Sequence, residues 1–215
     1  MNFLNEEATQ TLQTYFADVN KKTTIVLFNE DGANGGTETA QVLRELVALK
    51  ENFHLIEKDL QADAELAAEY GVVRAPAYVL LDEDDTFTRV RFNGVPLGHE
   101  INSLISAIAE VGGQSQEMPA DMLERVKQID KPVDIKVFVT LQCPHCPGAV
   151  QKAHALARHN PNIQAEMVEA ESFPELSTQY RVGSVPHTVF NDGQDLIGNL
   201  PFDEFIKHAE QAANA

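Results

Sequence analysis

Residues 137–147 read Val-Phe-Val-Thr-Leu-Gln-Cys-Pro-His-Cys-Pro and carry the only two cysteines of the chain, Cys143 and Cys146. The apolar start of this stretch predicts a buried strand. After the motif, residues with helical spacing follow: Val150, Ala153 and Ala157. A strand, a Cys-x-x-Cys loop and a helix place the first cysteine at a helix N-terminus, where free N–H groups and the helix dipole favour a thiolate. The stretch therefore predicts a redox dithiol.

Composition sets the limits for the rest of the chain. Its 215 residues fit one large domain or two of about 100 residues each. The formal charge of −17 argues against binding to nucleic acid or to an anionic membrane surface. No basic and apolar leader opens the sequence, and no apolar run approaches the roughly 18 residues that a membrane span needs. We therefore expect a cytoplasmic globular protein.

The second half of the sequence repeats the first. Periodicity in the first half predicts helices and strands in the order helix 5–19, strand 25–28, helix 37–50, strand 53–58, helix 63–70, strands 72–81 and 87–92, and helix 100–110. Equivalent residues recur at a constant offset of 110 positions: Ile25 and Ile135, Phe28 and Phe138, Tyr70 and Tyr180, Val72 and Val182, Pro76 and Pro186. Such an offset predicts two copies of one unit.

The repeat also predicts the domain organisation. The offset maps the two cysteines onto Ala33 and Gly36, so the first copy has the loop without the thiols. We expect a domain at 1–112 that lacks the Cys-x-x-Cys motif and a domain at 113–215 that carries it. A glycine-rich linker at 112–116 would join them.

These features resemble a known family. A strand–Cys-x-x-Cys–helix unit, followed about 40 residues later by Val185-Pro186 at the start of a strand, resembles the thioredoxin fold, which is of the α/β class. Two such units in tandem, the first redox-inactive, resemble the N-terminal domain of the flavoprotein subunit of alkyl hydroperoxide reductase. Glutaredoxin-like protein disulfide oxidoreductases are built similarly. The motif Arg-Phe-x-Gly-x-Pro-Leu-Gly-His-Glu at 91–100 also matches that flavoprotein. The resemblance implies two units packed on one another.

The two cysteines have different expected roles. Cys143, at the solvent side of the loop, should attack as a thiolate, and Cys146, one turn further in, should resolve the mixed disulfide. The alternatives are half of a zinc site or two inert thiols. Zinc takes about four ligands, and the sequence has no second Cys-x-x-Cys and no His-x-x-x-His pair. We therefore expect no metal and a redox-active Cys143–Cys146 disulfide.

Pro144 and His145, between the cysteines, depart from the family pattern. They match the dipeptide of strongly oxidising thiol oxidases, and a protonated His145 would favour the thiolate and a more oxidising couple. The alternative is a solvent-facing histidine with no role. His154 and His159, further along the same predicted helix, we expect at the surface.

The remaining expected site residues come from the resemblance. It implies a cis peptide bond between Val185 and Pro186, lying against the sulfurs, although an ordinary trans proline at a strand start is the alternative. Val137 occupies the place of the buried acid that thioredoxins usually carry. The resemblance implies that Glu100, in the inactive copy, reaches across to the dithiol instead. The alternative is a glutamate that only stabilises a helix N-terminus.

We therefore expect a dithiol–disulfide oxidoreductase. It would take electrons from a thioredoxin-reductase-like flavoprotein and pass them to a peroxiredoxin or another protein disulfide. NAD(P)H and FAD would act only through that partner, because no nucleotide-binding module follows in this sequence. The alternatives are a protein disulfide oxidant or isomerase, and a non-catalytic binding module with this fold.

Overall fold

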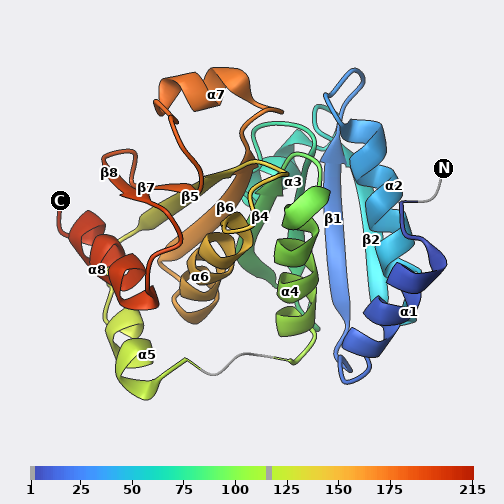
Figure 1. Cartoon of the computed structure of the whole chain (residues 1–215), viewed down its shortest axis with the longest axis horizontal. Helices are drawn as coiled ribbons and strands as arrows, with labels where there is room; N and C mark the ends of the chain where they lie inside the picture. Colours follow the sequence, from blue (N-terminus) through green and yellow to red (C-terminus); the bar gives the residue numbers. More distant parts are fainter. Residues whose placement is uncertain (1–2, 115–117) are drawn as a thin grey trace.

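The computed structural model describes residues 3–114 and 118–215 (Figure 1). In chain order its elements are α1 (Glu6–Tyr15), β1 (Thr23–Asn29), α2 (Gly36–Val47), β2 (Phe53–Asp59), α3 (Ala64–Glu69), β3 (Ala77–Leu81), β4 (Phe87–Asn93), the 3-10 turn η1 (Gly98–Glu100), α4 (Ile101–Val111), α5 (Ala120–Lys127), β5 (Val133–Val139), α6 (Cys146–His159), β6 (Ile163–Glu169), α7 (Pro174–Gln179), β7 (His187–Phe190), β8 (Gln194–Ile197) and α8 (Phe202–Ala213).

The strands form one continuous sheet in the order β2-β1-β3-β4-β6-β5-β7-β8. In the first half β1 runs parallel to β2 and antiparallel to β3, which pairs with β4 as a hairpin. In the second half β5, β6, β7 and β8 repeat that arrangement. The predicted tandem of two thioredoxin-like folds is confirmed, and the 110-residue offset holds from β1 and β5 through to β3 and β7.

The two halves are joined through the sheet itself. Strand β4 pairs in parallel with β6, with Val90 opposite Ala165 and Asn93 opposite Val168. We expected two units packed on one another, and the hydrogen-bonded junction makes them a single sheet. The predicted domain bounds, 1–112 and 113–215, remain a prediction. Residues 115 and 116 of the predicted linker lie outside the described residues.

Helices cover both faces of the sheet. Successive residues of a strand face opposite sides. On β5, Val137 belongs to the large core that α2, α4, α6 and α8 cover, whereas Phe138 belongs to a smaller core under α7. On β1, Val26 and Phe28 face a similar small core under α3. The redox motif therefore starts a helix that lies in the large core, next to α4 of the other half.

A buried charge cluster crosses the junction on the opposite face. The side chain of Glu166, on β6, is 5% exposed. Its Oε2 accepts hydrogen bonds from Arg74 Nη1 at 2.9 Å and from Asn93 Nδ2 at 2.8 Å. Both donors come from the first half, so this carboxylate binds the two halves together beside the β4–β6 pairing.

Some predicted elements have different limits. The strand expected from Val72 begins at Ala77, because residues 72–76 form a connection and Pro76 has no N–H to donate to a neighbouring strand. The helix expected from Glu100 is a 3-10 turn over Gly98–Glu100 that continues as α4. That turn matters for the site.

Candidate active site

Cys143 and Cys146 are joined by a disulfide, with their Cα atoms 5.5 Å apart. Strand β5 ends at Val139, a turn follows, and α6 begins at Cys146. We expected Cys143 at the helix start, and it lies three residues earlier, in the turn that leads into α6. That turn still brings it to the end of α6 where the first backbone N–H groups have no partner within the helix.

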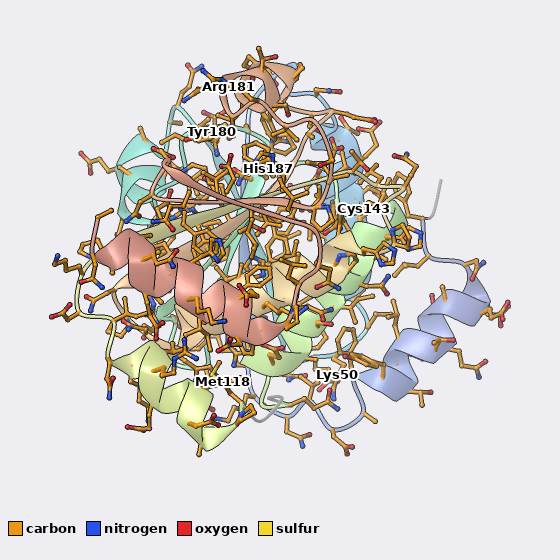
Figure 2. All side chains as sticks on the ribbon, turned by 60° about the vertical axis from the view of Figure 1, so that its left-hand side comes forward. Lys50, Met118, Cys143, Tyr180, Arg181 and His187 are labelled. Atoms are coloured by element: carbon orange, nitrogen blue, oxygen red, sulfur yellow. A yellow bond between two sulfur atoms is a disulfide. The ribbon has the colours of Figure 1, made fainter. Side chains whose placement is uncertain are left out.

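The two cysteines differ in exposure. Cys143 is half-buried and packs against the edge of the large core, whereas Cys146 is fully buried. A partner sulfur can therefore reach Cys143 and not Cys146. Figure 2 shows Cys143 on the opposite side of the molecule, in that view, from Met118 and the start of α5.

Pro144 and His145 are exposed between the cysteines. His145 is the N-cap of α6, and its side chain makes no capping hydrogen bond. The imidazole is therefore free to act on the neighbouring sulfur or on a partner. Its role in tuning the thiolate remains a prediction.

The peptide bond between Val185 and Pro186 is cis, as the resemblance implied. It lies directly before β7, where His187 pairs with Phe138 of β5. This register places Pro186 beside the end of β5, where the turn carrying Cys143 begins. The carbonyl of Pro186 accepts a hydrogen bond from Gly198 N at 2.8 Å, which ties the loop to the end of β8.

Glu100 is fully buried in η1, which packs against α6. The backbone N–H of His99 donates to the carbonyl of Leu141 at 2.8 Å, and Leu141 lies two residues before Cys143. Gly98 has a φ of +57°, and a Cβ atom there would collide with the same carbonyl. The inactive half thus places Glu100 beside the turn that carries the redox motif. Among the described residues, no hydrogen bond joins Glu100 to either cysteine.

The Glu100 carboxyl has an unusual environment. Its pKa is raised from 4.5 to about 7, chiefly by burial; the hydroxyl of Ser103 partly offsets this rise and the charge of Glu169 adds to it. Ser103 donates to Glu100 Oε2 at 2.7 Å. The sequence patterns did not single out Ser103. Its position three residues after Glu100, on one helix face, is the signal that could have identified it.

The first half cannot carry the same chemistry at the matching place. Gly36, which corresponds to Cys146, begins α2, and a Cβ atom there would collide with the side chain of Asn29. Pro76 is cis like Pro186, and its carbonyl accepts from Gly94 N at 2.9 Å. The loop geometry is retained in this half, and a neighbouring side chain occupies the space that a thiol would need.

The surface position expected for His154 is wrong. His154 is 3% exposed, and its ring packs edge-on against Phe92 of β4 at a centroid distance of 4.7 Å. Burial lowers its pKa to about 3. The reason is that the junction places β4 and α4 against a second face of α6. His159 is half-buried near the end of that helix.

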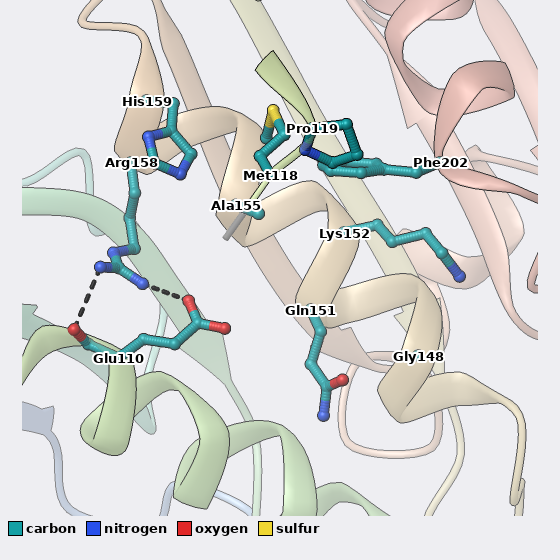
Figure 3. A pocket seen from close by; sticks show the side chains of 10 residues that line it. All are labelled: Glu110, Met118, Pro119, Gly148, Gln151, Lys152, Ala155, Arg158, His159 and Phe202. Carbon is teal, nitrogen blue, oxygen red and sulfur yellow. Dashed lines mark hydrogen bonds and ion pairs between the residues drawn. The ribbon is translucent and has the colours of Figure 1, made fainter. Parts of the chain in front are cut away.

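A cavity of about 240 Å³ lies against α6, whose residues from Gly148 to His159 form one of its walls (Figure 3). Its walls come from the end of α4, the segment before α5 and the first residue of α8. Arg158 and Glu110 form an ion pair at one side of it, with Arg158 Nη2 also donating to the carbonyl of Glu110 at 3.1 Å. Neither cysteine lines this cavity.

The described part of the chain offers neither a metal site nor a membrane span. Across residues 3–114 and 118–215, no group of three or more His, Cys, Asp or Glu side chains could hold a metal ion. Within those residues, every helix is too short or too polar to cross a membrane.

Comparisons with known proteins extend this picture. The thioredoxin domain family model matches residues 133–211, the half with the cysteines. The alkyl hydroperoxide reductase protein AhpF of Staphylococcus epidermidis is 30% identical over 170 residues. That match covers 79% of this chain and 30% of the relative. The corresponding protein of Pseudomonas putida is 26% identical over 204 residues, covering 95% of this chain and 37% of that protein.

Solved structures match over the whole fold. A structure of alkylhydroperoxide reductase AhpF from Enterococcus faecalis has a TM-score of 0.91 and 31% identity, covering 97% of this chain and 100% of that one. The NTD_N/C domain of the same protein has a TM-score of 0.91 and 30% identity, covering 96% and 100%. This chain belongs to the AhpF N-terminal-domain family. A protein disulfide oxidoreductase from Aeropyrum pernix, 24% identical with a TM-score of 0.90, covers 100% of this chain and 95% of that one and shares the fold.

Membership in the AhpF family agrees with the coarse assignment from the site. The chain is an AhpF-like thioredoxin-fold protein with a cysteine pair that forms a disulfide. It spans about a third of the length of the full AhpF proteins that it resembles in sequence.

Proposed function

We propose that this protein carries electrons between a thioredoxin-reductase-like flavoprotein and the disulfide of a peroxiredoxin. The flavoprotein would supply electrons from NAD(P)H through its FAD. The observation that carries the proposal is the asymmetric Cys143–Cys146 disulfide, with one accessible and one buried sulfur. AhpF relatives, named for alkyl hydroperoxide reduction, support this pairing of donor and acceptor. The cytoplasm, where reductases keep thiols reduced, is the compartment that suits it.

The reductive reaction has two exchange steps. The Cys143 thiolate attacks one sulfur of the partner disulfide; a mixed disulfide forms and the other partner sulfur leaves as a thiolate. Cys146 then loses its proton to Glu100 and attacks the sulfur of Cys143. The Cys143–Cys146 bond forms and the second partner sulfur leaves. The partner gains two electrons, and its two thiolates take up the two protons that the cysteines gave up.

The other site residues would support these steps. Val185 and the cis Pro186 present a backbone edge beside the sulfurs for an extended partner segment. Pro144 and His145 shape the exposed side of the motif, and a protonated His145 would stabilise the Cys143 thiolate. Glu100 serves as the acid and base for Cys146, because the matching strand position is the apolar Val137.

Replacing Cys143 with serine tests the proposal. The variant should lose reduction of both insulin and a peroxiredoxin, measured with NADPH and a thioredoxin-reductase-like flavoprotein. As a control, Cys146→Ser should keep the attacking thiol and accumulate a covalent complex with the peroxiredoxin that dithiothreitol releases. Undiminished turnover by Cys143→Ser would refute the enzyme assignment in favour of a binding module.

The exposed His145 favours a second candidate, a net protein disulfide oxidant. The two directions differ in reduction potential, which a glutathione redox titration of the dithiol measures. A potential near about −270 mV suits a reductase, and one near about −120 mV suits an oxidant.

A further inference from the structure

The Ser103 hydroxyl is hydrogen-bonded to the Glu100 carboxyl. It donates to Oε2 at 2.7 Å, and both residues are buried, Ser103 at 1% exposure and Glu100 at 0%. The other carboxyl oxygen, Oε1, has no hydrogen-bond partner among the described residues. The serine therefore occupies one oxygen and leaves the other free for a proton from elsewhere.

A second buried carboxylate lies in the other half, and its charge raises the pKa of Glu100. Glu169, 2% exposed, ends β6 and faces the same side of the sheet as Met167, toward the large core. It packs against Gly94, at the start of the loop that leads to η1. Its carboxylate accepts hydrogen bonds from Ser172 Oγ and Ser172 N, each at 2.6 Å, and from Glu171 N at 3.2 Å.

We propose that Ser103 and Glu169 are positioning residues for Glu100 with opposite effects. Ser103 orients the carboxyl and favours its anion, because a hydroxyl donor stabilises negative charge. Glu169 disfavours the same anion, because two negative charges repel in a buried site. Two other titratable groups lie on elements near Glu100: the buried Tyr78 of β3, whose pKa the charge of Glu100 raises, and Cys146 at the start of α6, which packs against η1.

The balance between these effects matters for proton transfer. This inference rests on the acid–base role proposed above for Glu100. During resolution of the mixed disulfide, the S–H bond of Cys146 breaks, its electron pair stays on sulfur, and an O–H bond forms on Glu100. In the reverse direction the same proton returns. A carboxyl with a pKa near neutral pH can both accept this proton and return it, whereas a carboxyl with the usual, lower pKa would be a poor acid.

Carbon-13 NMR of the disulfide form, labelled in its glutamate carboxyls, tests the inference without turnover. The Glu100 resonance is identified by its absence in Glu100→Gln. Its midpoint should lie near 7 in the unmodified protein. Ser103→Ala should raise the midpoint by about 0.5–1 pH unit, and Glu169→Gln should lower it by about one unit.

Matched variants separate positioning from general disruption. Ser103→Thr keeps the hydroxyl and should restore the original midpoint. Glu171→Gln removes an exposed charge two residues from Glu169 and should leave the midpoint unchanged. If Glu169→Gln does not fold, Glu169→Asp can replace it. This change shortens the side chain by one methylene group, moves the charge away, and should lower the Glu100 midpoint by a smaller amount.

The outcomes distinguish this inference from the proposed function. A Glu100 midpoint that stays within 0.2 unit (on the order of the error of such a titration) in both Ser103→Ala and Glu169→Gln would overturn it, even if peroxiredoxin reduction proceeds. Conversely, loss of activity in Cys143→Ser together with the opposite midpoint shifts would uphold both. The pH profile for resolution of the mixed disulfide should move in the same directions as the NMR midpoints.

Discussion

Glu100 and His154 are buried titratable residues. Folding raises the pKa of Glu100 and lowers that of His154, so the uncharged form of each is favoured. Burial favours the uncharged state of both a carboxyl and an imidazole. The two residues therefore impose opposite dependences of stability on pH. Between pH 4.5 and 6.5 their effects oppose each other, so only comparison with variants can separate them.

Glu100 should make the fold less stable as pH rises. Its pKa is about 7 in the folded protein and 4.5 in the reference state, so the unfolded chain holds fewer protons in this window. The stabilisation present below pH 4.5 is lost by pH 7 and amounts to roughly 3 kcal/mol. Urea unfolding at several pH values should show this loss in the unmodified protein and not in Glu100→Gln. Parallel curves for the two proteins would contradict the burial argument.

His154 should act in the other direction. Its pKa is about 3 in the folded protein and 6.5 in the reference state, so stability is present above pH 6.5 and falls with acidification. The slope should approach about 1.4 kcal/mol per pH unit within this range. A His154→Leu variant, measured by the same unfolding curves, should lose that slope. An unchanged slope would show that other groups cause the acid sensitivity.

At the scale of elements, η1 decides where Glu100 lies. This single turn is fixed to the redox loop by the hydrogen bond from His99 N to the carbonyl of Leu141. The approach is close enough that only glycine fits at position 98, where φ is also positive. The inactive half is therefore held against the redox loop by a backbone contact.

Gly98→Ala should separate the turn from the loop. The added methyl group would meet the Leu141 carbonyl in a strained backbone conformation, and we expect a loss of about 1–3 kcal/mol in the free energy of unfolding. The rate at which the mixed disulfide resolves should fall as well. Gly183→Ala is the matched control, because a Cβ atom there meets nothing within 4 Å. Equal effects of the two changes would argue against a docking role for η1.

The sequence was informative for elements that local patterns determine. Apolar periodicity located β1, β5 and the helices that follow, and the repeat located the counterpart of each. The proline after Ala75 was visible, but the strand predicted from Val72 begins only at Ala77, after that proline. The 3-10 turn at Gly98–Glu100 was missed because its geometry is imposed by Leu141, which is distant in the sequence.

For the molecule as a whole, the β4–β6 junction is the main feature that the sequence did not reveal. A repeat indicates two copies of a unit and says nothing about which edges meet. The junction surrounds α6 with elements of the first half, which is why His154 is buried while its helical spacing indicated an exposed face. The cysteines, the cis Pro186 and Glu100 were identifiable because each belongs to a short motif. Ser103 was missed although it lies only three residues after Glu100, whereas Glu169 required the assembled sheet.

Glu166 should be important for this junction. Glu166→Gln would leave Arg74 and Arg91 near a neutral amide in a largely buried site, and breaking such a pair costs about 3 kcal/mol. Thermal or urea unfolding measures the loss. Glu57→Gln, which breaks an exposed pair with Arg44, should cost at most about 1 kcal/mol. Similar losses for both variants would show that the buried cluster does not hold the halves together.

The β4–β6 pairing also bears on why a half without cysteines persists. A thioredoxin-like unit on its own would leave β4 or β6 as an open edge, with unpaired N–H and C=O groups able to recruit strands from other molecules. In the duplicated chain these two edges protect each other. Deleting the cysteine-free copy would thus leave β6 as an exposed, aggregation-prone edge strand. Selection for solubility alone would therefore act to retain both copies.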